Sequence, residues 1–202
     1  MDILLIRHCE SYHSSLENYN PEKCCPDPLL TDNGRRQAEQ LAKKLVGKGI
    51  DAIYCSDLLR AVETANIINS YVKCSVFIDS ALREINMGDI HLSSWDSFQD
   101  YYAEWKLHKD DMRYPGGECG QDVWERCSVS LNNIIRSNAS RVAIITHGGT
   151  IRVIICGILG IPQTKRFYLG APLECCSLSV IRYSETENKY FLHSFNDNSI
   201  LF

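Results

Sequence analysis

The sequence predicts an α/β fold, a three-layer α/β/α sandwich around a mostly parallel central sheet. Two observations predict it. Strand-like runs alternate with segments that have the apolar spacing of helices, and this alternation is typical of a sheet covered by helices on both faces. The strand-like runs are apolar at every position, as in strands buried on both faces of a parallel sheet. These runs are residues 3–6, 52–55 and 142–145.

The two helices expected with these strands each carry one apolar stripe. The first helix, residues 33–47, follows Thr31 and Asp32, which suit a helix N-cap. Gly47 and Gly49 suit its C-terminal end. Small or apolar residues recur at the i, i+3, i+4, i+7 spacing of one helix face: Ala38, Leu41, Ala42 and Leu45, and, after the second strand, Ala61, Thr64, Ala65 and Ile68.

A stretch rich in aromatic residues, 87–140, interrupts this alternation around the turn Pro115-Gly116-Gly117. We expect it to form a mostly helical insertion over one edge of the sheet, where it could serve as a lid. The alternative is that its aromatic side chains only pack the insertion against the core. These side chains are Trp95, Phe98, Tyr101, Tyr102, Trp105, Tyr114 and Trp124.

The C-terminal part is expected to close the sheet with two more strands. Residues 177–182 alternate between polar and apolar, a turn follows near 185–189, and residues 190–195 read as a second strand. This pattern predicts a hairpin or two edge strands. The sequence shows no repeat, low-complexity tract or linker, so one domain over residues 1–202 is expected.

Charge and composition exclude several classes of partner. The 202-residue chain has a net charge of −4, so it lacks the basic excess that a nucleic acid or an anionic membrane requires. Only four apolar residues precede Arg7, too few for a signal peptide or a membrane span. We therefore expect a cytoplasmic protein. A small phosphorylated metabolite stays a suitable partner because it needs only a few local cations, and the oligomeric state is left open.

The ten cysteines are expected to be reduced thiols. A chain long enough for a sizeable core does not need a disulfide framework. Cys24-Cys25 and Cys175-Cys176 are adjacent pairs, and no Cys-x-x-Cys occurs, so the spacing of a metal site is absent from the sequence. We expect no metal and no cofactor.

Polar residues follow each of the three predicted strands at the point where the strand ends. Ligands of open α/β sheets bind beyond the carboxyl ends of the strands, so these residues are expected to converge on one edge. They are Arg7-His8 after the first strand, Ser56-Asp57 with Arg60 after the second, and Thr146-His147-Gly148-Gly149 after the third. The N–H groups of Gly148 and Gly149 would add an anion-binding nest at a helix start.

This cluster has the chemistry of phosphoryl transfer. The guanidinium groups of Arg7 and Arg60 match phosphate oxygens. They also lower the pKa of a nearby imidazole, because a second cation is disfavoured there. A neutral His8 could then attack phosphorus, and a protonated His147 could stabilise the equatorial oxygens in the transition state. Taken alone, His147 is explained equally well by a structural role.

Motifs over nearly the whole chain resemble those of the histidine phosphatase superfamily, the phosphoglycerate-mutase-like fold. Leu5-Ile6-Arg7-His8-Cys9-Glu10-Ser11 is similar to its hydrophobic-Arg-His-Gly-Glu-Ser/Thr signature. Residues 27–38 are similar to its Pro-Leu-Thr-x-x-Gly-x-x-Gln-Ala stretch with one extra leucine, and residues 54–65 to its Ser-x-Leu-x-Arg-Ala-x-x-Thr-Ala block. Three further segments match in order: Leu82-Arg83-Glu84 with Gly88, Pro115-Gly116-Gly117-Glu118, and the strand 142–149 that leads to the second His-Gly.

The resemblance implies a role for each candidate residue. His8 would attack phosphorus in line and become phosphohistidine. Arg7, Arg60 and His147 would hold the phosphoryl oxygens. Glu84 would protonate the leaving oxygen and then activate water for hydrolysis. No metal is required, because the protein supplies the cations.

Some positions depart from the family pattern. Cys9 replaces the usual glycine, and its Cβ would make a positive φ costly there. A redox role of Cys9 is an alternative to simple packing. Ser14 stands where many members have an asparagine that contacts phosphate, and its hydroxyl has a shorter reach. Ser14 and Gly148 are the remaining substrate-binding candidates, and Cys175 stands in for another asparagine of the family pattern.

We expect a phosphatase that acts on a small phosphomonoester. A cofactor-dependent phosphoglycerate mutase is the second hypothesis, and a non-catalytic phospho-ligand binder is the third. The phosphatase is favoured over the mutase because the sequence ends at Phe202, directly after the last predicted strand, and because Asp27-Pro28-Leu29 resembles phosphatase members. The binder is disfavoured because the phosphate-site residues and Glu84 are all present.

Overall fold

A computed structural model describes residues 1–12, 16–170 and 172–199 and is built on a six-stranded sheet. The strand order is β5-β4-β6-β1-β7-β8. The pairings from β5 through β4 and β6 to β1 are parallel, and the β1–β7 and β7–β8 pairings are antiparallel. The strands are β1 (Asp2–Arg7), β4 (Ala52–Cys55), β5 (Ser75–Ile78), β6 (Arg141–Thr146), β7 (Leu178–Ser184) and β8 (Lys189–Asp197).

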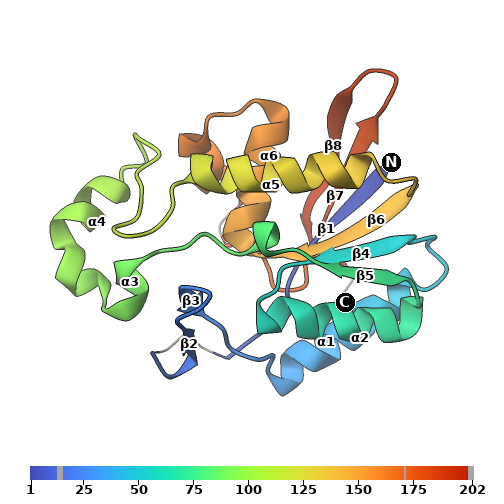
Figure 1. The fold of residues 1–202 in the computed structure, drawn as a ribbon, viewed down its shortest axis with the longest axis horizontal. Helices are drawn as coiled ribbons and strands as arrows, with labels where there is room; N and C mark the ends of the chain where they lie inside the picture. The colour runs from blue at the N-terminus through green and yellow to red at the C-terminus, as the bar shows by residue number, and fades with distance from the viewer. Residues whose placement is uncertain (13–15, 171, 200–202) are drawn as a thin grey trace.

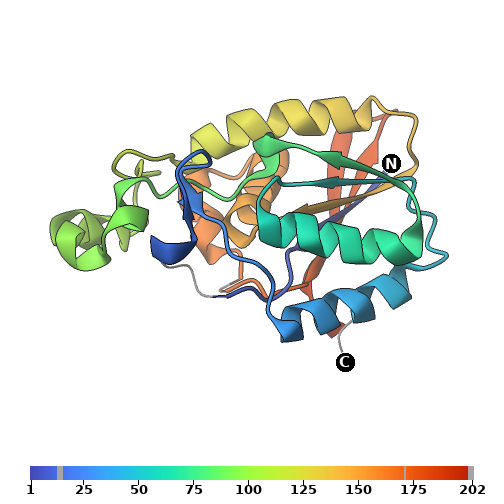
Figure 2. The ribbon, with the colours of Figure 1, turned by 60° about the horizontal axis from the view of Figure 1, so that its bottom comes forward.

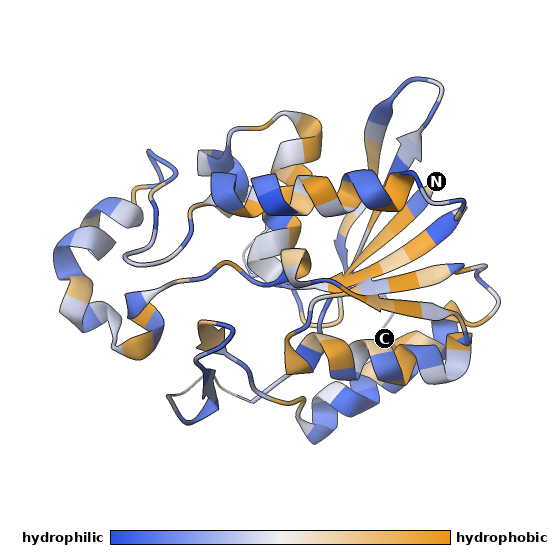
Figure 3. Ribbon diagram, viewed as in Figure 1, coloured by the Kyte–Doolittle hydropathy of each residue, from blue (hydrophilic) through white to orange (hydrophobic). Residues whose placement is uncertain are grey.

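Helices cover both faces of this sheet, which confirms the predicted α/β sandwich. α1 (Asp32–Leu45) and α2 (Leu59–Val72) lie on one face, and α5 (Gly120–Ile135) and α6 (Gly148–Leu159) lie on the other (Figures 1 and 2). Apolar residues gather in the strands and on the inward sides of the helices, while the outward sides are more polar (Figure 3). None of the helices in the described ranges is long and apolar enough to cross a membrane.

Most of the predicted elements are present within one or two residues. β1, β4 and β6 contain the three predicted apolar strands. Thr31 caps α1, since its hydroxyl accepts the N–H of Gly34 at 2.9 Å. The helix ends at Leu45, ahead of Gly47 with its φ of 72°. β7 and β8 pair antiparallel, so the predicted C-terminal strands form a hairpin.

The insertion is shorter than the predicted 87–140. Its short helices α3 (Asp89–Leu92) and α4 (Gln99–Trp105) project beyond the carboxyl ends of the strands (Figure 1). The residues after Cys119 form α5, which belongs to the sandwich. The buried stripe of α5 includes Val123, Cys127, Leu131 and Ile134. The prediction was wrong here because the neighbouring aromatic residues obscured this helical spacing.

The aromatic side chains of the insertion pack mainly on one another. The ring centroid of Trp95 lies 4.8 Å from that of Tyr102 and 5.2 Å from that of Trp105. Trp105 also reaches Phe167, at 5.2 Å, in the 3-10 helix η4 (Gln163–Tyr168). This contact ties the insertion to the sandwich.

Two small elements were not predicted. β5 exposes three of its four residues and forms one edge of the sheet through its pairing with β4. A separate two-stranded hairpin consists of β2 (Tyr19–Asn20) and β3 (Cys25–Pro26). β2 and β3 have two residues each, too few for a periodic pattern, and β5, although as long as β4, is an exposed edge strand without a fully apolar run.

Candidate active site

Three parallel strands bring the candidate residues to one edge of the sheet. Arg7 lies opposite Thr146 at the end of the β1–β6 pairing. The pairing continues one step further, because the N–H of His8 donates to the carbonyl of Thr146 at 2.8 Å. The residues that follow the three strands, His8, His147 and Ser56, therefore emerge at the same edge.

His8 is held in one tautomer. The side chain is buried, with 6% of its surface exposed. Its Nδ1 lies 2.8 Å from the carbonyl oxygen of Cys9, and its Nε2 lies 3.2 Å from Nε of Arg60. A carbonyl oxygen only accepts and a guanidinium only donates, so Nδ1 carries the proton and Nε2 keeps a lone pair. This is the form in which Nε2 can act as a nucleophile.

Both histidines of the site are held neutral. Burial, followed by the charges of Arg60 and Arg7, lowers the pKa of His8 well below its ordinary value. Burial and then Arg60 also lower the pKa of His147. The two rings lie 5.1 Å apart, centroid to centroid, so a charge on one disfavours a charge on the other. His147 therefore enters the site as a neutral side chain, whereas the transition-state role inferred from the sequence is that of a protonated ring.

His147 offers a free N–H group to the site. The side chain is fully buried, and its Nε2 lies 2.9 Å from the hydroxyl oxygen of Ser56. That hydroxyl oxygen also accepts the N–H of Leu58 at 3.2 Å, and its own proton can be donated to Nε2, which selects one of the two tautomers of His147. Nδ1 then carries the remaining proton. It is buried and has no hydrogen-bond partner among the described residues.

Arg7 and Arg60 stand beside the imidazoles without acidic partners. Nη1 of Arg7 donates to the carbonyl of Leu173, and Nη1 of Arg60 donates to the carbonyl of Pro26 at 3.1 Å. Within the described ranges neither guanidinium forms an ion pair, and Nε of Arg7 is buried without a partner. Nε of Arg7 and Nδ1 of His147 are thus two buried donors that the oxygens of an anion could satisfy.

Glu84 lies against the start of α6. Its Oε1 accepts the N–H groups of Ile85 and Thr150, each at 3.0 Å, and the Thr150 hydroxyl at 3.2 Å. Its Oε2 accepts the N–H of Gly149 at 3.1 Å. Burial lowers the pKa of Arg60, and the nearby charge of Glu84 opposes that shift. Glu84 therefore caps α6 and also lies close enough to Arg60 to affect its pKa.

The expected anion-binding nest is wrong for Gly149. The N–H of Gly149 binds Glu84, because the chain at residue 84 lies over the helix start. Gly148 lies against Arg7, since a Cβ added at Gly148 would be 3.5 Å from Nε of that arginine. The candidate Ser14 lies outside the described residues.

Comparison with known proteins places this chain in a family. Residues 3–198 match the histidine phosphatase superfamily (branch 1). The chain belongs to this superfamily. The probable phosphoglycerate mutase GpmB of Cronobacter sakazakii (strain ATCC BAA-894) is 31% identical over 191 residues, which cover 92% of this chain and 86% of that protein. GpmB of Salmonella paratyphi B (strain ATCC BAA-1250 / SPB7) is 30% identical over 192 residues, or 93% and 87% of the two chains.

Solved structures of other proteins share its fold. A mycobacterial glucosyl-3-phosphoglycerate phosphatase is 25% identical, with a TM-score of 0.79 over 98% of this chain and 99% of that chain. YhfR of Bacillus stearothermophilus is 24% identical, with a TM-score of 0.82 over 100% and 99% of the two chains. The chain is thus a phosphatase or a phosphoglycerate mutase-like enzyme of the histidine phosphatase superfamily.

Cysteine at position 9 of this histidine phosphatase superfamily member fits without backbone strain. Cys9 has a negative φ, so the loss of the usual glycine costs nothing there. Its sulfur lies 2.8 Å from that of Cys176, and both side chains are buried. Burial, and then the hydrogen bond with Cys176, raises the pKa of the Cys9 thiol. The cysteines are free thiols, and these properties favour the packing interpretation of Cys9 over a redox role.

Sequence reasoning missed the side chain that holds the segment of Glu84. Arg126 on α5 donates to the carbonyls of Ala81, Arg83 and Glu84, at 2.6, 2.9 and 3.2 Å. It also pairs with Glu118 at 2.9 Å. No spacing rule links residues 84 and 126, so no signal in the sequence of this superfamily member could have shown the contact.

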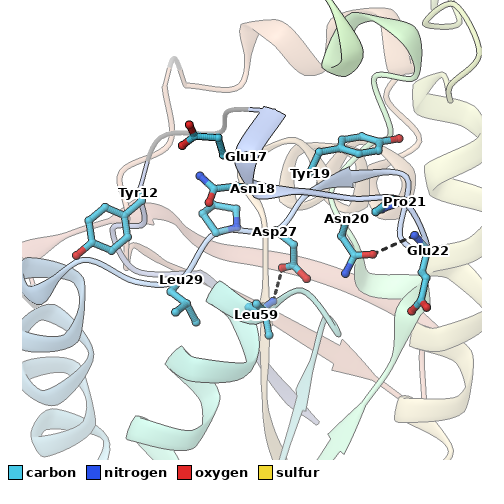
Figure 4. Close-up of a pocket in the computed structure, with 11 residues that line it drawn as sticks. Tyr12, Glu17, Asn18, Tyr19, Asn20, Pro21, Glu22, Asp27, Leu29 and Leu59 are labelled. Atoms are coloured by element: carbon cyan, nitrogen blue, oxygen red, sulfur yellow. Dashed lines mark hydrogen bonds between the residues drawn. The ribbon is translucent and has the colours of Figure 1, made fainter.

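A hollow of about 1000 Å³ lies beside the β2–β3 hairpin (Figure 4). None of the catalytic candidates lines it. Asp27 in its wall accepts the N–H of Leu59 at 2.5 Å, which anchors the hairpin to α2. The hairpin thereby keeps the carbonyl of Pro26 next to Arg60, so this region supports the site rather than forming it.

Proposed function

We propose that this chain is a phosphatase that hydrolyses a small phosphomonoester through a phosphohistidine on His8. One observation carries the proposal. Nε2 of His8 keeps a lone pair at a sheet edge where two buried nitrogens lack partners in the described structure, Nε of Arg7 and Nδ1 of His147. Nδ1 of His147 is a donor when Ser56 donates to Nε2 of the same ring. A phosphoryl group bound there would offer oxygens to both donors and phosphorus to Nε2.

In the first half of the reaction, Nε2 of His8 attacks phosphorus in line with the ester oxygen. The N–P bond forms as the P–O bond breaks, and the leaving oxygen takes a proton from Glu84. The hydrogen bond from Nδ1 to the Cys9 carbonyl stabilises the positive charge that the imidazole gains. Arg60 turns its Nε–H from Nε2 to a phosphoryl oxygen.

The oxygen of Glu84 that suits the transferred proton is Oε2. In the described structure Oε1 accepts three hydrogen bonds, whereas Oε2 accepts one. Oε2 therefore has a lone pair free for a proton. In the second half of the reaction, the same oxygen takes a proton from the water that attacks phosphohistidine. Inorganic phosphate leaves, and Nε2 of His8 regains its lone pair.

The proposed reaction uses no metal and no cofactor, because Arg7 and Arg60 supply the positive charge. A net charge of −4 suits a small phosphorylated metabolite better than a nucleic acid. We also propose that the protein acts in the cytoplasm.

A phosphoglycerate mutase reaction is the second candidate. The relatives at 31% and 30% identity that are named as probable phosphoglycerate mutases favour it. Both reactions would pass through the same phosphohistidine. They differ in the next step, since a mutase returns the phosphoryl group to a substrate hydroxyl and a phosphatase transfers it to water.

Phosphate release distinguishes these candidates. Purified protein is given p-nitrophenyl phosphate, a panel of phosphometabolites, and 3-phosphoglycerate with its bisphosphate primer. The proposal predicts phosphate release that His8→Ala abolishes and that His193→Ala, at an exposed histidine on β8, leaves unchanged. Isomerisation of 3-phosphoglycerate without phosphate release would contradict it. Absence of both turnover and trapped phosphohistidine would favour the phospho-ligand binder.

A further inference from the structure

A second cavity, of about 290 Å³, opens beside Glu84 between the insertion and α6. Ile85 and Gly149 form its inner end, and both donate their N–H groups to the carboxylate of Glu84. Under the proposed function, on which this inference rests, Glu84 protonates the leaving oxygen. The part of the substrate attached to that oxygen then has two cavities within reach: this one, and a more polar one of about 450 Å³ that Glu84 itself lines with Arg83 and Arg126. Both of those arginines are held in ion pairs, whereas the aromatic cavity contains an unpaired cation and is therefore the better candidate.

The outer walls of the cavity are aromatic. Trp95, Trp105 and Tyr114 come from the insertion, and Phe167 comes from η4. The rings of Trp105 and Phe167 meet edge to face at 5.2 Å and 79°. The volume lies at the low end of ligand pockets, roughly 300 Å³. His108 stacks on Phe167 at 3.9 Å and the guanidinium of Arg166 lies 4.3 Å from the centre of the same ring, so Phe167 offers mainly its edge. The rings from the insertion supply the flat apolar walls, and these suit one planar ring in so small a space.

Arg152 brings a positive charge into this apolar cavity. It follows Gly149 by three residues on α6, so one helical turn separates it from the inner end at Glu84. The carbonyls of Leu169, at 3.0 Å, and of Gly170 hold its guanidinium. Burial lowers the pKa of Arg152, and the charge of Glu84 opposes that shift. The cation is therefore fixed in place and partly withdrawn from water.

The arginines around the site fall into two groups. Three form ion pairs: Arg83 with Asp57, Arg126 with Glu118 and Arg166 with Asp111. Three have no carboxylate within ion-pair distance in the part of the chain that the structure describes: Arg7, Arg60 and Arg152. The second group contains the charges that a substrate must balance.

A phosphoryl dianion balances only two of these three charges, those of Arg7 and Arg60. Glu84 contributes no negative charge at the moment of proton donation, because it must then carry the proton. Arg166 also lines the cavity but is already held in its ion pair, so among the described lining residues Arg152 is the guanidinium without a carboxylate partner, and an anionic group on the substrate would balance its charge. A carboxylate matches a planar guanidinium with two parallel hydrogen bonds.

We propose that the substrate is the phosphate ester of a hydroxylated aromatic acid, whose ring occupies the aromatic cavity and whose carboxylate binds Arg152. Arg152 then determines specificity and takes no part in the chemical step. Trp105 and Phe167 select for the ring.

Two matched compounds test the charge. 4-Carboxyphenyl phosphate and 4-carbamoylphenyl phosphate have similar shapes and differ by one negative charge. Calorimetry on the His8→Ala variant measures Kd without turnover, and kcat/KM is measured on the unaltered chain. We expect the carboxylate compound to bind about tenfold more tightly than the carbamoyl compound, because its carboxylate forms a charge-assisted hydrogen bond with Arg152. Arg152→Gln should remove this difference, and Arg152→Lys should retain part of it.

Further variants separate the ring from the charge. Arg136→Gln removes an exposed arginine after α5 and should leave the preference intact. Trp105→Ala should weaken the binding of both aromatic compounds relative to ethyl phosphate. Thermal melts check the folding of each variant. If Arg152→Gln does not fold, the preference for the carboxylate compound is compared between the unaltered chain and Arg152→Lys instead.

The possible results distinguish this inference from the proposed function. Equal Kd values for the two aromatic compounds overturn the inference. If both compounds are nevertheless hydrolysed in a His8-dependent reaction, the phosphatase proposal stands and only the carboxylate site is rejected. A binding preference that depends on Arg152, with no hydrolysis of any compound, overturns the phosphatase and supports the carboxylate site.

Discussion

The protonation of each imidazole is set by what its two nitrogens face. In His8 a carbonyl on one side and a guanidinium on the other leave a single neutral tautomer. In His147 the hydroxyl of Ser56 faces Nε2, and when that hydroxyl donates, the N–H group lies at Nδ1, which has no partner in the described structure. Ser56 is thus a positioning residue that acts through His147.

Replacing Ser56 with alanine is expected to free His147 from this tautomer and to leave its Nε2 buried without a partner. We expect kcat to fall about tenfold or more, as on loss of one oriented donor. The free energy of unfolding should fall by about 1–3 kcal/mol, the penalty of an unsatisfied buried polar atom. Phosphate-release kinetics and urea denaturation measure the two effects. Ser70→Ala, at an exposed serine of α2, is the control, and an unchanged kcat in Ser56→Ala contradicts the assigned role.

At the scale of elements, Glu84 lies in an irregular segment between the 3-10 helix η2 (Ser80–Leu82) and α3. The side chain of Arg126 holds this segment through three carbonyl oxygens. A helix of the sandwich therefore positions the proposed general acid, although that acid belongs to no strand or helix itself.

Arg126→Met is expected to loosen this segment. The substitution removes the Arg126 hydrogen bonds to three carbonyls and its ion pair with Glu118, so the free energy of unfolding should fall by about 2–4 kcal/mol. The carbonyls of Ala81 and Arg83 keep the Cys127 thiol and the Thr150 hydroxyl as donors, and Glu118 keeps the N–H of Asn86. A displaced Glu84 should lower kcat more than it raises KM. Arg113→Met is the matched control, because the pair of Arg113 with Asp122 is exposed and its loss should cost much less. Equal losses in the two variants, or an unchanged kcat in Arg126→Met, would refute this role.

For the whole molecule, the buried neutral histidines predict a loss of stability in mild acid. Burial and then Arg60 lower the pKa of both His8 and His147 in the folded chain, below the unfolded value of about 6.5. Above that value neither state binds these protons. Below it the unfolded chain takes up protons that the folded chain excludes, so the free energy of unfolding falls. The slope is about 1.4 kcal/mol per pH unit for each histidine.

Urea denaturation between about pH 7 and pH 5 measures this slope. His91 and His108 add to it in the same direction, because burial lowers their pKa as well. His8→Gln should reduce the pH dependence of the free energy of unfolding by the contribution of one histidine, about 1.4 kcal/mol per pH unit. His193→Gln, at an exposed position, should leave it unchanged. An unaltered slope in His8→Gln would show that His8 is not the buried neutral group described.

The elements that could be predicted are those with a local signal. β1, β4 and β6 are apolar runs, and α1 has both a stripe and a cap, so each could be located within a few residues. β5 is as short as β4 but is exposed and lacks a fully apolar run, and the stripe of α5 was masked by neighbouring aromatic residues.

By itself, the sequence determined the α/β class, the three strand ends and the set of side chains proposed to bind phosphate, because runs, stripes and motifs are properties of neighbouring residues. Only the tertiary structure decided which atoms of those side chains are free to react. The Ser56–His147 bond spans 91 residues, and the bond between Glu84 and the N–H of Thr150 spans 66. The direction of a hydrogen bond and the burial that shifts a pKa arise from such distant contacts, which no local spacing encodes.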